Sequence, residues 1–353
     1  MWAVWNQPSD GLHLGGPLAH RGRGGLSRSL VRAADESFTD HPAIVTQLVE
    51  ARRQYGWGAT KLLAVLRARA PEQAWPTRST VNALLAQRGL LRRQRRTRRW
   101  PHPGAAPLET RAPNDVWPAD FKGQFKTRDG RYCYRLTVTD HFSRAVLLCR
   151  ALPSTATAEV QPAFRALFRR VGLPVAIRTD NGAPFASTGL HGLSALNVWW
   201  MQLGIVHQRI RRGYPQANGT HERMHRELKR ETAAPAAATA RAQQRRFDAF
   251  QRRYNEERPH EALGNRPPAT RWQPSRRAYP ERIAAPVYPT HADVRRIRRG
   301  GDLRFRGHYV FVSHVLAGCD VALEEVADGL WNIAYYATVL GRWDARTGRV
   351  TAG

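Results

Sequence analysis

Cysteine is scarce in this sequence, and the few cysteines are poorly placed for pairing. Only Cys133, Cys149 and Cys319 occur among 353 residues, and they lie far apart with no CxxC pair. An odd count without close spacing argues against a disulfide framework and against a zinc finger. Free thiols of this kind are typical of a reducing compartment. We therefore expect a fold held by a hydrophobic core, which 42% hydrophobic residues can supply.

Long apolar runs are also missing. No uninterrupted apolar stretch is long enough to span a bilayer. The N-terminal residues MWAVWNQPSDGLHLGGPLAH lack the basic segment followed by an apolar run that marks a secretory signal. These absences predict a cytoplasmic protein without a membrane partner.

Acidic residues are outnumbered by basic residues. The 28 Asp and Glu stand against 56 Lys and Arg, which gives a net charge of +28 and a pI near 11.4. This excess is too large to be a by-product of surface solubility, and it indicates a polyanionic partner. No basic amphipathic helix stands apart from a folded context, so nucleic acid is favoured over a membrane surface.

The start of the chain divides into a segment without periodicity and a helical module. Residues 1–42 are rich in Gly, Ser and Arg, and we expect a poorly ordered or truncated segment there. Residues 43–91 contain three stretches with apolar residues at helical spacing, and Gly56 interrupts them after the first. This outline fits a helix-turn-helix whose last helix enters the major groove of DNA, and it fits an ordinary helical bundle equally well.

Residues 92–113 are predicted to be a basic arm followed by a Pro/Ala linker. The run RRQRRTRR precedes PHPGAAPLETRAP. A charge run is usually only solvated, but this one lies between a possible DNA-reading module and a second domain, which favours phosphate contact. The residues expected to bind DNA are Arg95, Arg96, Arg98 and Arg99.

Residues 114–271 are predicted to form a mixed α/β domain. Three strands at 116–125, 132–139 and 145–149 follow one another as an antiparallel meander, with Asp129-Gly130 as a turn signal. The elements that follow are a helix at 157–171, a strand at 175–179, a helix at 193–203, a strand at 205–210 and a long helix at 218–231. This order is expected of an RNase-H-like fold, in which helices cover a mixed sheet.

The end of the chain is predicted to be a linker, residues 272–292, and a small β-barrel, residues 293–353. Short β-like runs occur at 303–312, 320–326, 330–335 and 338–343, and Asp328-Gly329 is a turn signal among them. We expect this Arg-rich domain to bind DNA mainly through the phosphate backbone.

Three carboxylates occupy informative positions in the α/β domain. Asp120 lies toward the middle of the first strand, where a buried carboxylate is either paired or bound to a metal. Asp180 closes the strand VAIRTD and, taken alone, would be a turn former. Glu222 lies on the final helix and, taken alone, would be a surface ion pair.

Together these carboxylates predict a metal site. Two hard oxygen ligands from adjacent strands and one from a facing helix make an incomplete octahedral cage, which suits Mg2+, with Mn2+ as a substitute. Two such ions can activate the attacking oxygen and stabilise the leaving oxygen in phosphodiester chemistry. We therefore predict that Asp120, Asp180 and Glu222 are the catalytic residues and the metal ligands.

Several longer strings carry a family resemblance. They are VWPADFKG, TDHFSRAV, IRTDNGAPF, GYPQANGTHERMHRELKRE and YNEERPHEALGNRPP. In this order they resemble bacterial insertion-sequence transposases with a retroviral-integrase-like (DDE) catalytic core, over about residues 43 to 350. The resemblance places Asp120, Asp180 and Glu222 at the metal ligands. Asp140 and Asp115 compete with them; we interpret Asp140 as a turn residue or a support for a neighbouring Arg, and Asp115 as lying outside the cage.

The resemblance also suggests where DNA binds. Arg226 and Lys229 follow Glu222 by four and seven positions, so they share its helix face and are predicted to meet the phosphates of a DNA end. Residues 211–220 look like the mobile loop that precedes the catalytic helix in integrases. His225 either supports the metal shell or is an ordinary packing or solvent residue.

The reaction implied by the resemblance is hydrolysis at transposon ends, which exposes a 3′ hydroxyl, followed by in-line attack of that hydroxyl on target DNA. The expected partners are double-stranded DNA and further copies of the chain, because synapsis of two ends implies a homo-oligomer in the bacterial cytoplasm, associated with the nucleoid. One alternative is a catalytically inactive DNA-binding regulator, against which the complete carboxylate set argues. The other is an RNase-H-like nuclease without strand transfer, which a DNA-joining assay would distinguish.

Similar transposases usually begin with an additional helix-turn-helix ahead of the module that starts here near Ala43. Residues 1–40 are too rich in glycine and too poor in apolar periodicity to build one. We therefore hypothesise that Met1 is an internal or frame-shifted start, with roughly 40 to 60 helical residues encoded upstream. Stop codons in every frame directly before Met1, with no such pattern between them, would contradict this.

Overall fold

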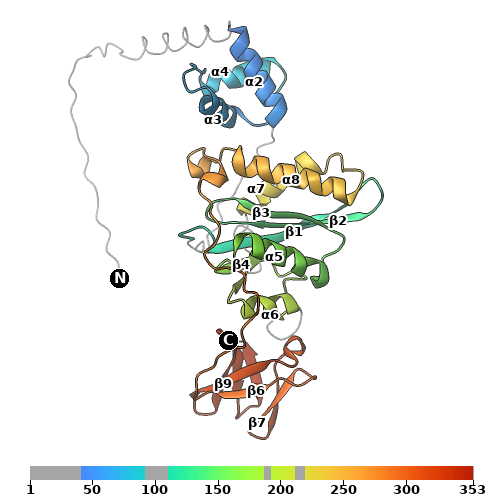
Figure 1. Ribbon diagram of the computed structural model, residues 1–353, viewed down its shortest axis with the longest axis vertical. Helices are drawn as coiled ribbons and strands as arrows, with labels where there is room; N and C mark the ends of the chain where they lie inside the picture. The colour runs from blue at the N-terminus through green and yellow to red at the C-terminus, as the bar shows by residue number, and fades with distance from the viewer. Residues whose placement is uncertain (1–40, 92–109, 187–191, 211–218, 353) are drawn as a thin grey trace, which may run out of the picture. The chain divides into compact units, whose positions relative to one another are not determined.

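The computed structural model describes residues 41–91, 110–186, 192–210 and 219–352 (Figure 1). The chain divides into two compact units, residues 1–96 and 97–353. No helix within the described ranges is long and apolar enough to cross a membrane.

The first unit contains three helices with a core of their own. They are α2 (Pro42–Tyr55), α3 (Ala59–Arg69) and α4 (Arg78–Gln87). Gly56 ends α2 with φ 63°, a left-handed conformation that favours glycine, and the side chain of Thr77 caps α4 by accepting from the Thr80 amide. The three predicted helices are thus present, and helix-turn-helix function stays a prediction. The fully buried side chains of this core are Leu48, Leu62, Val81 and Leu85.

A mixed five-stranded sheet forms the centre of the second unit. Its strands are β1 (Val116–Lys126), β2 (Tyr132–Thr139), β3 (Val146–Leu152), β4 (Ala176–Thr179) and β5 (Val206–Arg209), in the order β3-β2-β1-β4-β5. The predicted antiparallel meander β1-β2-β3 is confirmed, and β4 and β5 run parallel to β1. This arrangement makes the strands of Asp120 and Asp180 direct neighbours.

Helices cover both faces of this sheet (Figure 1). On one face, α5 (Thr157–Val171) and α6 (Ala195–Gln202) share a core that includes the fully buried Trp117, Phe164 and Trp200. On the other face, α7 (Gly219–Thr232) and α8 (Ala240–Glu256) pack with Cys133, Val146 and Cys149. The elements predicted for this domain are therefore present, and α8 is an addition that the sequence analysis missed.

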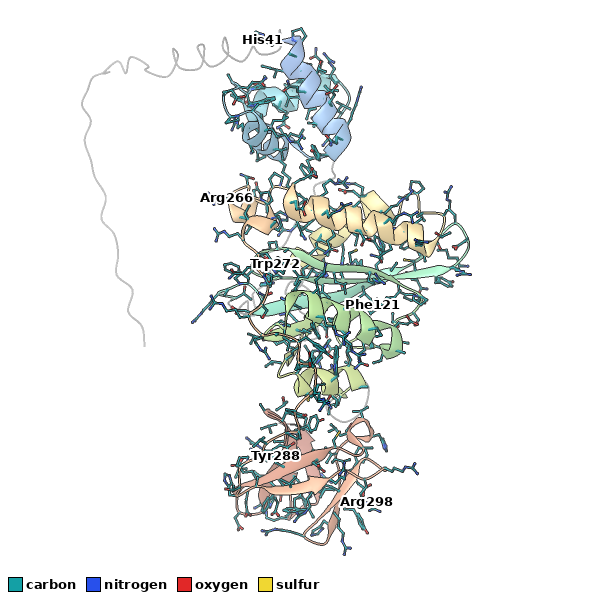
Figure 2. The ribbon with its side chains drawn as sticks, viewed as in Figure 1. His41, Phe121, Arg266, Trp272, Tyr288 and Arg298 are labelled. Carbon is teal, nitrogen blue, oxygen red and sulfur yellow. The ribbon has the colours of Figure 1, made fainter. Side chains whose placement is uncertain are left out.

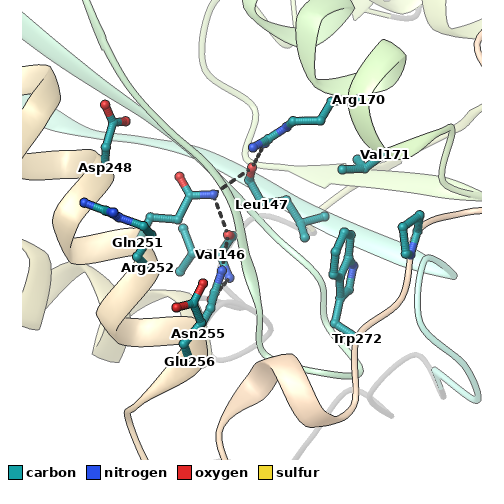
Figure 3. Close-up of a pocket in the computed structure, with 11 residues that line it drawn as sticks. Val146, Leu147, Arg170, Val171, Asp248, Gln251, Arg252, Asn255, Glu256 and Trp272 are labelled. Atoms are coloured by element: carbon teal, nitrogen blue, oxygen red, sulfur yellow. Dashed lines mark hydrogen bonds between the residues drawn. The ribbon is translucent and has the colours of Figure 1, made fainter.

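The edge strand β3 is closed by amide side chains of α8. Asn255 accepts from the Val146 amide at 2.8 Å and donates to the Val146 carbonyl at 2.9 Å. Gln251 donates to the carbonyls of Val146 and Leu147 at 2.9 and 3.1 Å (Figure 3). An open strand edge is a template for pairing with another chain, so these amides satisfy the backbone where a further strand would otherwise bind.

We expect the replacement of Asn255 by Leu to lower the free energy of unfolding by about 1–3 kcal/mol, because the Val146 amide loses its acceptor. Urea denaturation followed by circular dichroism measures the change. Glu256→Leu is the matched control, since Glu256 is the next residue of α8 and is exposed. Equal stabilities of the two variants would contradict a role for the Asn255 amide.

A cavity of about 540 Å³ lies beside this edge, between β3, α5, α8 and the chain at Trp272. Trp272 and Val171 line one side of it, and Gln251 and Asn255 line the other (Figure 3). The predicted catalytic carboxylates are not among its lining residues, so this hollow is separate from the candidate active site.

The last part of the second unit consists mainly of β-strands. A five-stranded antiparallel sheet, in the order β12-β11-β10-β9-β6, accompanies a hairpin of β7 and β8. The rings of Phe305, Trp331 and Trp343 meet edge to face in its core. Figure 2 marks Tyr288, whose hydroxyl donates to the Asp320 carbonyl of this domain. The strands are β6 (Asp293–Arg296), β7 (Asp302–Phe305), β8 (His308–Phe311), β9 (Asp320–Ala327), β10 (Leu330–Tyr335), β11 (Thr338–Asp344) and β12 (Arg349–Ala352).

The prediction of one β run at 303–312 was wrong. Arg306 and Gly307, with φ 49° and 83°, form a turn that splits the run into β7 and β8. The short strands β6 and β12 were also missed. Within residues 293–352, no hydrogen-bonded ladder joins the hairpin to the five-stranded sheet, so closure into a barrel stays a prediction. Short 3-10 helices lie at Glu261–Leu263, Pro268–Thr270 and His314–Leu316.

Candidate active site

The three predicted metal ligands lie on neighbouring elements of the second unit. Asp120 is on β1, Asp180 directly follows β4, and Glu222 is in the first turn of α7. The side chain of Asp120 is 16% exposed, whereas Asp180 and Glu222 are exposed residues. Parallel neighbouring strands bring the first two to the same part of the sheet, as the sequence analysis expected.

The carboxylates also interact electrostatically. The pKa of Asp120 is raised from 3.8 to about 6, first by burial and then by the negative charge of Asp180, with a smaller contribution from Glu222. Lys122 and the Phe121 amide act in the opposite direction and do not prevent this rise. The charged form of Asp120 is therefore disfavoured, and additional positive charge beside it would stabilise that form.

Basic side chains do not supply that charge as ion pairs. Within the described residues, Asp180 and Glu222 make no ion pair, and Asp120 approaches only His225, at 3.6 Å. Other acids of α7 are paired, since Glu227 contacts Arg258 and Glu231 contacts Arg253. In a chain with 56 Lys and Arg, three neighbouring acids that have no Lys or Arg ion pair among the described residues favour a cation.

The donor set fits a hard divalent cation, because carboxylate oxygens are the ligands that Mg2+ prefers. In residues 41–91, 110–186, 192–210 and 219–352, no three His, Cys, Asp or Glu side chains are grouped closely enough to hold a metal ion. Like charges repel one another, so three carboxylates are expected to draw together only around positive charge. The three residues therefore suit a divalent cation through their oxygen atoms and their neighbouring positions, although the described side chains are not drawn together into a cluster.

The competing carboxylates have other partners. Asp140 is fully buried, and its Oδ1 accepts from the Asn114 amide at 2.7 Å. Its Oδ2 accepts from the Ser143 amide and hydroxyl at 2.7 and 2.6 Å. Asp115 accepts from two backbone amides just before it, each at 2.9 Å. These contacts agree with the interpretation of Asp140 as a turn residue and Asp115 as lying outside the site.

Two buried histidines flank Glu222 on α7. His221 and His225 both contact the hydroxyl of Thr137 on β2, at 2.8 and 2.6 Å. Burial lowers the pKa of both, to about 3 for His221, so both rings are neutral near pH 7. The histidines therefore anchor α7, the helix that carries Glu222, to the sheet.

His225 was a sequence candidate with two possible roles, whereas His221 and Thr137 were not predicted. One signal was present. His221, Met224, His225 and Leu228 recur at helical spacing, and all four are buried. A polar residue on such an apolar face requires a buried hydrogen-bond partner. The helical spacing could therefore have indicated that the two histidines have partners in the core.

The predicted DNA contacts are only partly described. Arg226 and Lys229 are exposed on α7, as a phosphate contact requires. Arg95, Arg96, Arg98 and Arg99 lie outside the described residues, as does most of the predicted loop at 211–220.

Comparisons with known proteins show the family of the chain. Family models described as "Integrase core domain" match residues 110–215 and 203–268. The 39.2 kDa protein of insertion element IS476 from Xanthomonas euvesicatoria is 31% identical over 250 residues, which cover 69% of each chain. The 31.7 kDa protein of insertion element IS407 from Burkholderia multivorans is 29% identical over 244 residues, which cover 68% of this chain and 84% of that protein.

Among solved structures, the catalytic core domain of HTLV-2 integrase in complex with magnesium is similar at 17% identity. The match covers 45% of this chain and 97% of that one, with a TM-score of 0.36.

The mixed sheet and the family matches define a protein with an RNase-H-like integrase core. Within that class, the chain belongs to the bacterial insertion-sequence transposases, a family of polynucleotidyl transferases that act on DNA in transposition and integration.

Proposed function

We propose that this transposase hydrolyses DNA at the ends of its insertion sequence and then joins the exposed 3′ hydroxyl to target DNA. Asp120, Asp180 and Glu222 are the proposed catalytic residues and ligands of Mg2+, with Mn2+ as a substitute. The observation that carries this proposal is the set of three neighbouring carboxylates, which form no ion pair with a Lys or Arg of the described ranges and one of which has a pKa raised to about 6.

Bound divalent cations would polarise the phosphodiester and favour the attacking oxygen in its deprotonated form. The protein's own part is to hold the ligands and the DNA in place. β1 and β4 supply two carboxylates from a rigid sheet, and the buried histidines of α7 fix the helix that carries Glu222. In-line displacement needs such fixed positions, because a misplaced reactant loses much of the rate enhancement.

DNA binding is assigned to three parts of the chain. The helices of residues 43–91 would read the ends as a helix-turn-helix, and the basic arm with Arg95, Arg96, Arg98 and Arg99 would follow the phosphates. Residues 293–353 would contact the backbone as a small barrel. Two ends must be held together, so we propose a homo-oligomer on the DNA of the bacterial nucleoid.

Arg226 and Lys229 are proposed to contact end DNA. Changing both to Ala should weaken binding and reduce the slope of log K against log salt by about one for each lost phosphate contact. Fluorescence anisotropy over a range of salt concentrations measures this slope. The double Ala variant at Arg245 and Arg252 removes the same charge from exposed positions of α8 and is the control. An unchanged slope in the α7 variant would exclude that contact.

The proposed reaction is tested with purified protein, Mg2+ and a labelled duplex taken from the DNA that flanks the gene, where imperfect inverted repeats are expected. We expect a nick that leaves a 3′ hydroxyl, and then a joined product with a second duplex. Cleavage without joining would indicate a nuclease, and neither product, with DNA binding retained, would indicate an inactive regulator.

A further inference from the structure

A row of buried side chains extends from β2 through α7 to the carboxylate of Asp120. The hydroxyl of Thr139 lies 3.2 Å from Nδ1 of His221, whose Nε2 lies 2.8 Å from the hydroxyl of Thr137. That hydroxyl lies 2.6 Å from Nε2 of His225, and Nδ1 of His225 lies 3.6 Å from Oδ2 of Asp120. The two threonines and two histidines are each at most 8% exposed.

The number of hydrogens available limits the directions that this row can take, and the Asp120 carboxylate facing Nδ1 of His225 favours a hydrogen on that nitrogen. A neutral histidine has one N–H, and a threonine hydroxyl has one hydrogen. If Thr139 donates to His221, then His221 donates from Nε2 to Thr137. Thr137 then donates to Nε2 of His225, and His225 carries its hydrogen on Nδ1, which faces Asp120.

The alternative pattern is less favourable. Thr137 could donate to the backbone carbonyl of Asp120 at 3.1 Å, and both histidines would then donate to Thr137 from Nε2. In that case the lone pair of His225 Nδ1 would face a carboxylate oxygen in a buried place, which is repulsive. Nδ1 of His225 has no hydrogen-bond partner among the described residues, and a donor there needs only a small rotation of the Asp120 carboxylate to gain one.

We propose that His225 is a positioning residue for Asp120, with its Nδ1–H directed at Oδ2 so that the other carboxylate oxygen is presented to the cation. This proposal rests on the proposed function, because it takes Asp120 as a metal ligand. A hydrogen bond from a neighbouring side chain fixes the orientation of a metal ligand, and its loss typically weakens metal affinity about 10- to 100-fold.

Two neutral variants separate this role from simple packing. In His225→Asn, the amide nitrogen lies near the former Nδ1, so the donor to Asp120 is kept and the contact with Thr137 is lost. In His225→Gln, the amide lies near the former Nε2, so the contact with Thr137 is kept and the donor to Asp120 is lost. Thermal unfolding of both variants reports how much each lost contact contributes to stability.

Calorimetric titration with Mg2+, without DNA, measures the expected difference. We expect His225→Gln to bind Mg2+ about 10- to 100-fold more weakly than the wild type, and His225→Asn to stay within about threefold of it. Equal affinities of the two variants, or a larger loss with Asn, would overturn the positioning role.

A second measurement uses the unaltered protein. Nitrogen-15 shifts of the imidazoles should report Nδ1–H for His225 and Nε2–H for His221, and an Nε2–H tautomer of His225 would overturn the proposal. Asp120→Asn tests the proposed metal site separately from the positioning role of His225. If Asp120→Asn binds Mg2+ as the wild type does, the proposed metal site fails. If it loses Mg2+ while His225→Gln keeps it, only the positioning role fails.

Discussion

Replacing Asp180 by Asn should abolish Mg2+-dependent cleavage and joining while DNA binding stays nearly intact. The change removes a proposed metal ligand but almost none of the phosphate-binding surface. We expect the cleavage rate to fall by roughly a thousandfold or more, and the same result for Asp120→Asn and Glu222→Gln. Single-turnover cleavage of end DNA measures the rate, and anisotropy measures binding. Joining at the wild-type rate by Asp180→Asn would exclude the assignment.

The chain contains a matched control for this prediction, because Asp140 and Asp180 both follow a threonine at the end of a strand. Asp140 is buried and accepts three hydrogen bonds, whereas Asp180 is exposed. Asp140→Asn should therefore lower the free energy of unfolding by about 1–3 kcal/mol and leave the reaction of folded protein intact. Asp180→Asn should abolish the reaction and leave the free energy of unfolding almost unchanged. If Asp140→Asn abolished the reaction and Asp180→Asn lowered stability, Asp140 would be the catalytic residue and Asp180 the structural one.

The central sheet was predictable because its strands are short runs rich in apolar residues, largely buried in β1 to β4, and the first hairpin turns at a clear Asp-Gly signal. β2 has the predicted bounds, and Gly130 takes the positive φ that the Asp-Gly turn requires. The helix α8 was missed because its apolar side chains are few. Phe247, Phe250 and Tyr254 form its buried stripe, and the amides that hold β3 look like ordinary surface residues in the sequence.

The carboxylates of the candidate site could be chosen from the sequence, since their positions depend on strand order and on a recognisable family pattern. The side chains that surround these carboxylates could not be chosen from the sequence. The contact of His225 with Thr137 depends on the pairing of Asp120 with Thr137 across β1 and β2, and on the height at which α7 packs on the sheet. Register and helix height are tertiary properties, and a one-residue shift would have placed Thr137 on the opposite face.

A row of aromatic rings supports the site from the opposite face of the sheet. Trp200 of α6 packs against Phe164 and Phe185, with ring centroids 5.3 and 6.2 Å away. Phe185 lies five residues after Asp180 and meets Phe121, the neighbour of Asp120, at 5.8 Å. Trp200 lies on α6, so this helix contributes to the core beneath β1 and β4, which carry or precede the candidate carboxylates Asp120 and Asp180.

Replacing Trp200 by Ala should lower the free energy of unfolding by about 3–5 kcal/mol, because a fully buried indole leaves a cavity that its aromatic neighbours cannot fill. Trp200→Phe should cost less, since it keeps an aromatic ring and removes a buried indole N–H that has no partner among the described residues. Val206→Ala, at a side chain 55% exposed on β5, is the control and should change stability by about 0.5 kcal/mol or less. Urea denaturation gives all three values. A loss below about 1 kcal/mol for Trp200→Ala would show that α6 does not support the sheet.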